Sequence, residues 1–276
     1  MPGVLAAGIS AGLVAIAATV AVERLGGRLG GLLGTLPTTI VPAAAGIAAN
    51  TTSPEAFEAA MAAVPVGMWV DVLFLLCWRV GPRWLPRWSG GARLLAMVVG
   101  SLVVWLVIAM LAVQGLDRAM ALGVPALWLG GLGIGASLLL GVVATVRPPP
   151  APKGTQGVGP GTLLSRGVLA AAAIAGAVSL ASIAGPTVSG IASVFPAIFL
   201  TSMVSLWWSQ GETVQGGAVG PMMLGASSVS AYALFAAVCL PRFGMWAGGL
   251  AAWLLAVGTV TVPAFLWLRT RRTATG

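Results

Sequence analysis

Long apolar runs, separated by short segments rich in charge, proline and glycine, make up most of this chain. Each run is close to the roughly 20 residues that a helix needs to cross about 30 Å of hydrocarbon. With 58% hydrophobic and 7% charged residues, the chain has too little polar surface for a soluble globule. We expect an all-α polytopic membrane protein with nine transmembrane helices, at residues 3–22, 29–49, 58–79, 94–114, 120–146, 166–184, 187–208, 214–240 and 244–268.

The basic residues predict how these helices are oriented. If the N-terminus lies outside, the inside connections hold all Lys and Arg residues except Arg118 and Arg242. Because basic loops stay on the cytoplasmic side, we expect an external N-terminus and a cytoplasmic C-terminus. Richness in Ala, Gly and Arg is typical of a bacterial gene of high GC content, so the predicted location is the bacterial cytoplasmic membrane.

A glycine-rich segment that ends in proline occurs twice in the chain. Residues 26–37 align without gaps on residues 185–196, at a constant offset of 159 (196 minus 37). Each copy follows one long apolar run and opens another, and the predicted topology places the copies on opposite sides of the membrane. This indicates two inverted four-helix repeats joined by a connecting helix, an architecture that many secondary transporters share.

The repeat divides the chain into four parts. These are a first membrane repeat (1–117), a connecting helix (118–146), a cytoplasmic linker rich in Pro and Gly (147–162) and a second, inverted repeat (163–276). Further matches link the third and eighth runs at an offset of 161 (232 minus 71): Met61 with Met222, Asp71 with Tyr232, and Phe74 with Phe235.

The second copy also carries a resemblance to a known family. The stretch GIASVFPAIFL at 190–200 is followed by a short polar loop, which contains Gly211 and Glu212, and by another apolar run. It resembles the small four-span bacterial membrane proteins of the GlpM/DUF3147 type, and the first copy does so more faintly. The resemblance implies a fused, inverted duplication of such a unit and supplies no biochemical activity.

Both repeated prolines are predicted to lie at mid-membrane. Pro37 and Pro196 come about ten residues after their helices begin, which is about 15 Å of rise. A proline removes a backbone hydrogen bond, and lipid tolerates that only against protein or a water-filled cavity. We expect a substrate or ion site between two broken helices, lined by the prolines and by Thr35, Thr38, Thr39, Ser189 and Ser193. The alternative is close packing of small residues around a harmless kink.

Asp71 is the acidic residue that lies well inside an apolar run. An ionised carboxylate at that depth costs at least a few kcal/mol, and no basic residue lies at comparable depth to pair with it. Asp71 is therefore expected to be protonated or bound to a cation, and to couple transport to a gradient. The alternative is a protonated carboxyl that only links two helices. Tyr232, at the matching position of the other half, is expected to face Asp71 or else to be buried for packing.

Three further acidic residues precede matching helices of the two halves. Glu55 and Glu58 come before the third run, and Glu212 comes before the eighth. They are candidate vestibule charges, although acids in the first turn of a helix also complement its dipole.

The sequence argues against enzymatic and metal chemistry. It has no histidine, no HExxH and no GxSxG, and its two cysteines lie far apart, so we expect no enzyme, metal or cofactor. The net charge of +8 fits membrane topology rather than nucleic acid. The expected partners are the lipid bilayer and a small ion or solute; a homodimer stays open.

These features favour a transporter of a small cation or small polar solute, with alternating access and coupling to protons or another cation through Asp71. A passive ion channel is the nearest alternative. A non-catalytic membrane partner of an envelope complex is the third.

The first prediction concerns orientation. In a background without Cys77 and Cys239, a cysteine at position 89 should react with an impermeant maleimide only after the membrane is opened, because this loop is cytoplasmic. Labelling of intact cells at position 89 would contradict the orientation.

Overall fold

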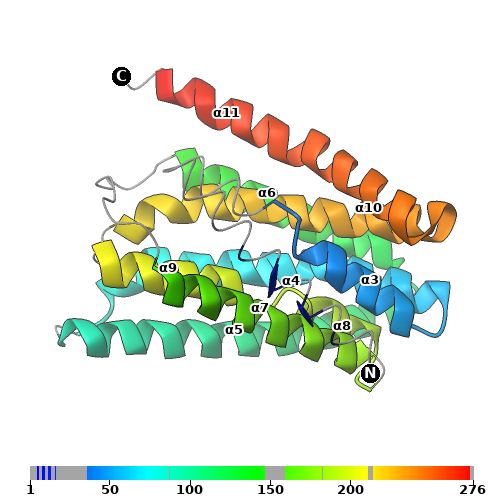
Figure 1. The fold of residues 1–276 in the computed structure, drawn as a ribbon, viewed down its shortest axis with the longest axis horizontal. Helices are drawn as coiled ribbons and strands as arrows, with labels where there is room; N and C mark the ends of the chain where they lie inside the picture. Colours follow the sequence, from blue (N-terminus) through cyan, green and yellow to red (C-terminus); the bar gives the residue numbers. More distant parts are fainter. Residues whose placement is uncertain are drawn as a thin grey trace.

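The computed structural model describes residues 5, 8–9, 12–13, 16, 36–86, 88–146, 159–181, 183–210 and 214–273. Every regular element in these ranges is helical (Figure 1). In chain order the elements are α3 (Ile40–Asn50), α4 (Pro54–Val80), η1 (Gly81–Arg83), α5 (Gly90–Ala121), α6 (Ala126–Val146), α7 (Pro160–Ala181), α8 (Pro186–Ala192), α9 (Ala197–Gln210), α10 (Val214–Ala256), η2 (Val257–Thr261) and α11 (Val262–Thr273).

Within the described ranges, five stretches are long and apolar enough to cross a membrane. They are Pro54–Arg83, Gly90–Ala121, Ala126–Val146, Pro186–Val204 and Ala218–Thr270. An all-helical, multi-pass membrane protein is therefore confirmed at this coarser level. Most of the predicted first run and the start of the second, including Thr35, lie outside the described residues.

The longest stretch contains two helices that meet at Gly244. Gly244 has φ 76° and ψ 173°, a backbone conformation that favours glycine. Beyond it the chain turns back, since a Cβ built on Gly248 would lie 2.5 Å from the carbonyl oxygen of Cys239. The turn falls in the gap between the predicted runs 214–240 and 244–268.

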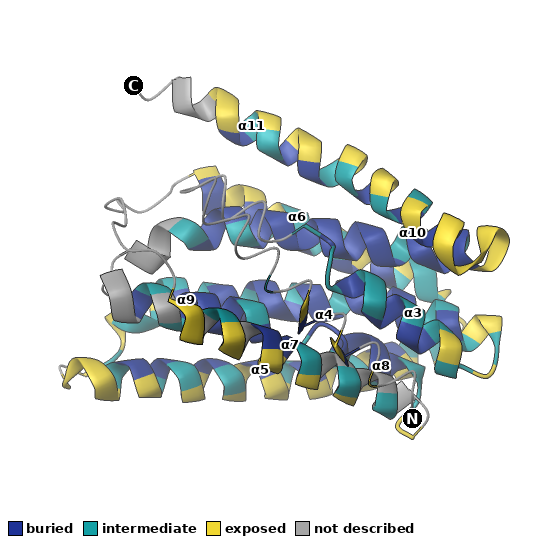
Figure 2. Cartoon of the chain, in the orientation of Figure 1, coloured by how far each residue is buried: buried dark blue, intermediate teal, exposed yellow. Residues whose placement is uncertain are grey.

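Helix α4 is the centre of the bundle. It packs against α3, α5, α6, α8 and α10, and Figure 2 shows it buried along most of its length. The peripheral helix α5 instead exposes a row of apolar side chains, including Val99, Val103, Leu106 and Met110. Such a surface is suited to lipid, which needs no polar covering.

Helix α6 joins the two halves through a stripe of small residues. Its buried face consists of Gly130, Gly133, Ser137, Gly141, Ala144 and Thr145. A Cβ on Gly133 would lie 2.9 Å from the backbone of Pro65 in α4, and one on Gly141 would lie 2.7 Å from Leu224 Cα in α10. The backbones of α4 and α10 therefore both approach α6 closely, as small residues permit in membranes.

Polar contacts show which helices end together. The Arg79 guanidinium, near the end of α4, donates a hydrogen bond to the carbonyl oxygen of Ala144, near the end of α6. Arg93 donates to the carbonyls of Pro82, Leu85 and Pro86 in the connection that follows α4. Arginines thus gather at one end of the bundle, where the sequence predicts the cytoplasmic side.

Two predicted boundaries need correction. The linker does not extend to residue 162, because α7 already begins at Pro160, and proline fits the first turn of a helix. The connecting helix does not begin at 118, because α5 continues to Ala121 and α6 begins at Ala126. The helix therefore passes through Asp117 and Arg118, whose charges lie at its solvent end, and Gly123 with φ 85° makes the turn.

The second prediction tests the close approach of α6 to α4. Gly133→Ala should lower the thermal unfolding temperature in detergent, at a cost of about 1–3 kcal/mol, because the new Cβ meets backbone. Gly135→Ala is the matched control, since nothing lies within 4 Å of its Cβ position. Equal unfolding temperatures for the two variants would contradict this packing.

Candidate functional site

The two repeated prolines lie in two separate local turns of the same kind. The Thr38 N–H donates to the Leu36 carbonyl across Pro37 at 2.6 Å, and the Ala197 N–H donates to the Phe195 carbonyl across Pro196 at 2.7 Å. The donors and the acceptors each correspond at the offset of 159 (197 minus 38, 195 minus 36). The second break is a full interruption, in which α8 ends at Ala192 and α9 begins at Ala197.

The helices that leave these turns run in opposite directions from the middle of the bundle. Figure 1 shows α3 leading toward the end where α4 begins, and α9 leading toward the end where α4 finishes. Two equivalent turns with opposite exits are what an inverted repeat requires.

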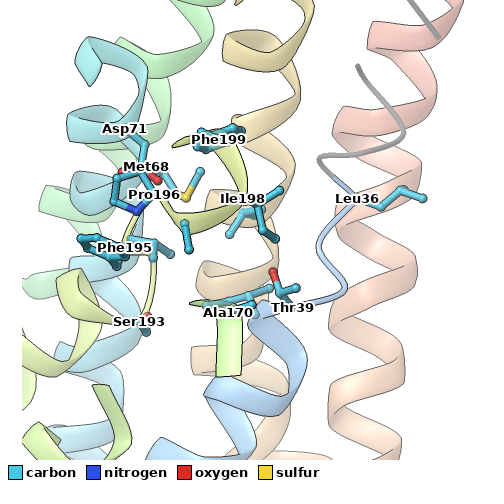
Figure 3. A pocket seen from close by; sticks show the side chains of 14 residues that line it. Leu36, Thr39, Met68, Asp71, Ala170, Ser193, Phe195, Pro196, Ile198 and Phe199 are labelled. Carbon is cyan, nitrogen blue, oxygen red and sulfur yellow. The ribbon is translucent and has the colours of Figure 1, made fainter. Parts of the chain in front are cut away.

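Both turns border one cavity of about 70 Å³ (Figure 3). Its lining contains four pairs of residues related by the repeat offsets: Leu36 with Phe195, Thr39 with Ile198, Ile40 with Phe199, and Met68 with Val229. The remaining lining residues are Asp71, Ala170, Ser193, Val194, Pro196 and Ala197. Each pair joins two positions that the repeat in the sequence predicts to be equivalent.

Among the described residues that line this cavity, Asp71 is the only charged one. Its side chain is 1% exposed, and its Oδ1 accepts a hydrogen bond of 2.6 Å from Trp105 Nε1 in α5. The Trp105 ring stands edge-on to Phe195, with centroids 5.2 Å apart and an interplanar angle of 81°. A side chain of α5 thus connects the carboxyl group to the second helix break.

The other predicted site residues are only partly gathered here. Thr39, Ser193 and Pro196 line the cavity. The Ser193 hydroxyl donates to the carbonyl of Gly190, and the Thr38 hydroxyl donates to that of Leu36. Pro37 and Ser189 are buried nearby without lining it.

Tyr232 does not meet the expectation that it faces the site. It is buried, yet it does not line the cavity, and its hydroxyl lies 3.8 Å from the Cβ position of Gly249 in the following arm of α10. The alternative interpretation, a tyrosine buried for packing, fits this placement.

The predicted vestibule acids lie away from the cavity. Glu55 is exposed in the first turn of α4, where Ser53 caps the helix by accepting a hydrogen bond from the Ala56 N–H. Glu58 is half-buried one turn later. Their position also suits the helix dipole. Glu212 lies outside the described residues.

Sequence reasoning missed Trp105. Tryptophan is common at membrane surfaces, whereas Trp105 is buried in the middle of α5. Its depth, near the centre of the run 94–114, is the signal that could have identified it. In the described part of the chain, no group of three or more His, Cys, Asp or Glu side chains is placed to hold a metal.

No family model, curated protein or solved structure matches this chain. A functional proposal for this protein therefore rests on the geometry of the cavity.

The third prediction concerns the bond between Asp71 and Trp105. Trp105→Phe leaves the carboxyl without its donor, and Asp71→Leu leaves the indole N–H without its acceptor, so each should cost about 1–3 kcal/mol of stability. The double variant should lose less than the sum, because neither partner is then left unpaired. Strictly additive shifts in unfolding temperature would contradict the bond; Asp117→Leu combined with Trp105→Phe provides the additive control.

Proposed function

We propose that this protein is a secondary transporter of a small ion or small polar solute, with the cavity between the two proline turns as its central site. The observation that carries the proposal is that both turns, although far apart in sequence, border one cavity that also contains Asp71. Broken helices that meet at a buried site between inverted halves are the usual arrangement in such transporters.

The buried carboxyl group supports a coupled mechanism. An ionisable residue inside a membrane protein is expensive, and it generally marks a path for protons, ions or substrates. Asp71 lines the cavity, so its charge and the bound solute can influence each other directly. In this proposal, Asp71 exchanges a proton or another cation with each cycle, as the sequence suggested.

The size of the cavity favours a transporter over an open channel. A volume of about 70 Å³ holds a few water molecules. That is far less than a continuous file of water across about 30 Å of hydrocarbon. A single small site between two halves suits alternating access, in which rocking of the halves opens the site to each side in turn.

The fourth prediction tests coupling through Asp71. In proteoliposomes that contain a trapped pH-sensitive dye, wild-type protein should move protons when a small ion or solute is supplied on one side. Asp71→Asn keeps the size and the acceptor for Trp105 but cannot titrate, so it should lose this proton movement. Asp117→Asn is the matched control, since Asp117 lies near the end of α5 and accepts from the Thr187 hydroxyl.

Two results would contradict the proposal. Solute-driven proton movement by Asp71→Asn at the wild-type rate would remove the coupling role of Asp71. Transport itself would be contradicted if the wild-type protein moved none of the small cations, anions and neutral solutes supplied.

A further inference from the structure

The interruption between α8 and α9 leaves hydrogen-bond donors, rather than acceptors, available at its helix ends. The last four carbonyls of α8 are all occupied: those of Ser189, Ile191 and Ala192 accept from the N–H groups of residues 193, 194 and 195, and that of Gly190 accepts from the Ser193 hydroxyl. The negative end of α8 is therefore satisfied locally.

The beginning of α9 differs, because the N–H groups in the first turn of a helix have no acceptor within that helix. In α9 these include the N–H groups of Ile198 and Phe199, and both residues line the cavity.

Helix α3 presents the same end to the cavity. Its N-cap residue Thr39 and its first residue Ile40 line the space, so α3 and α9 both begin there. Each helix N-terminus acts as roughly half of a positive charge. Two of them directed at one small space carry together about one positive charge, although no Lys or Arg is among the described residues that line it.

Asp71 supplies the independent observation that this space takes a ligand. The group is 1% exposed and lines the cavity. Its Oδ1 is bound to Trp105, while Oδ2 has no hydrogen-bond partner among the described residues. An unpartnered carboxyl oxygen therefore faces the space at which both helices begin.

Asp71 is the one charged residue among the described residues that line the cavity, and α7, which contributes Ala170 to the lining, carries Arg166 four residues earlier. Helices α3, α6, α8 and α9 contain no Asp, Glu, Lys or Arg. Helix α5 carries Arg93, Asp117 and Arg118 near its two ends, and α10 carries Arg242 beside its turn. Tyr232, the titratable group in the middle of α10, does not line the cavity.

We infer that the cavity binds one small monovalent anion together with a proton on Asp71, and this inference rests on the proposed transport function. An ionised Asp71 already offsets the positive ends of α3 and α9, so a second negative charge is repelled. When a proton from solution binds Oδ2, that offset disappears and the two helix ends accept an anion. Proton and anion then enter and leave together, with no net charge moved.

The volume suits a small anion such as chloride, nitrate or formate better than the much larger gluconate. The sequence had favoured a cation because it has no basic residue within the bilayer. The two helix ends provide the positive potential that the side chains lack.

The test uses proteoliposomes of the full chain with a trapped pH-sensitive dye. One set receives chloride, nitrate or formate as the salt of a large impermeant cation, and another receives lithium, sodium or potassium gluconate. Inward movement of an anion with a proton acidifies the interior, whereas exchange of a cation for a proton makes it alkaline. We expect acidification with the anions only, unchanged when the membrane potential is clamped by potassium and valinomycin; protein-free liposomes correct for leakage of formic acid.

Variants of Thr39 and of Asp71 test the role of each residue in anion and proton movement. Thr39→Asp keeps a good N-cap but adds a negative charge at the start of α3, and it should reduce anion-driven acidification at least about tenfold. Thr39→Asn, which has the size of the Asp variant but no charge, isolates the effect of the charge, so the comparison is between the two variants: acidification by Thr39→Asp should be at least about tenfold slower than by Thr39→Asn. Asp71→Asn should lose acidification yet still pass chloride, measured with a chloride electrode, because the amide imitates the protonated carboxyl.

The outcomes separate this inference from the proposed function. Alkaline shifts with the cation salts alone would overturn the anion inference and leave transport standing. Equal activity of Thr39→Asp and Thr39→Asn would also overturn it, since the helix end would then play no part. No response of the wild-type protein to any salt would overturn both.

Discussion

The structure depends on one constraint, which is that a backbone polar group in hydrocarbon must find a partner inside the protein. A helix broken at mid-membrane leaves such groups at its ends, and lipid cannot satisfy them. Here the turns around Pro37 and Pro196 pair part of their own backbone, and both border the same internal cavity. Met68 and Asp71 of α4 and Val229 of α10 line this space, from which α3 and α9 begin.

The positions that the repeat matches differ in chemistry. The matched pairs that line the cavity join a threonine with an isoleucine and a methionine with a valine. Asp71 lines the cavity, whereas Tyr232, at the matching position in the sequence, is buried beside Gly249. The titratable group at the cavity therefore comes from one of the two matched positions.

The turns at the two prolines could be predicted from the sequence because proline acts locally. The offset of 159 that aligns Pro37 with Pro196 also relates the hydrogen bonds across the two turns. The sequence did not identify Trp105 as the partner of Asp71, because a contact between α4 and α5 depends on tertiary packing that no local pattern encodes. Sequence reasoning also overlooked the positive helix ends. Proline in the first turn of a helix is common, so the prolines could have indicated that a helix starts, rather than only breaks, at each position.

The proposed transport function depends on the meeting of the two turns at one cavity. Its most direct test is chemical cross-linking of cysteines at Thr39 and Ile198, a matched pair in the lining, in protein that lacks Cys77 and Cys239. A short bifunctional thiol reagent should join the two positions within one chain, detected as a bridge between proteolytic fragments. If each single cysteine reacts with the reagent and the pair still gives no bridge, the two turns do not meet.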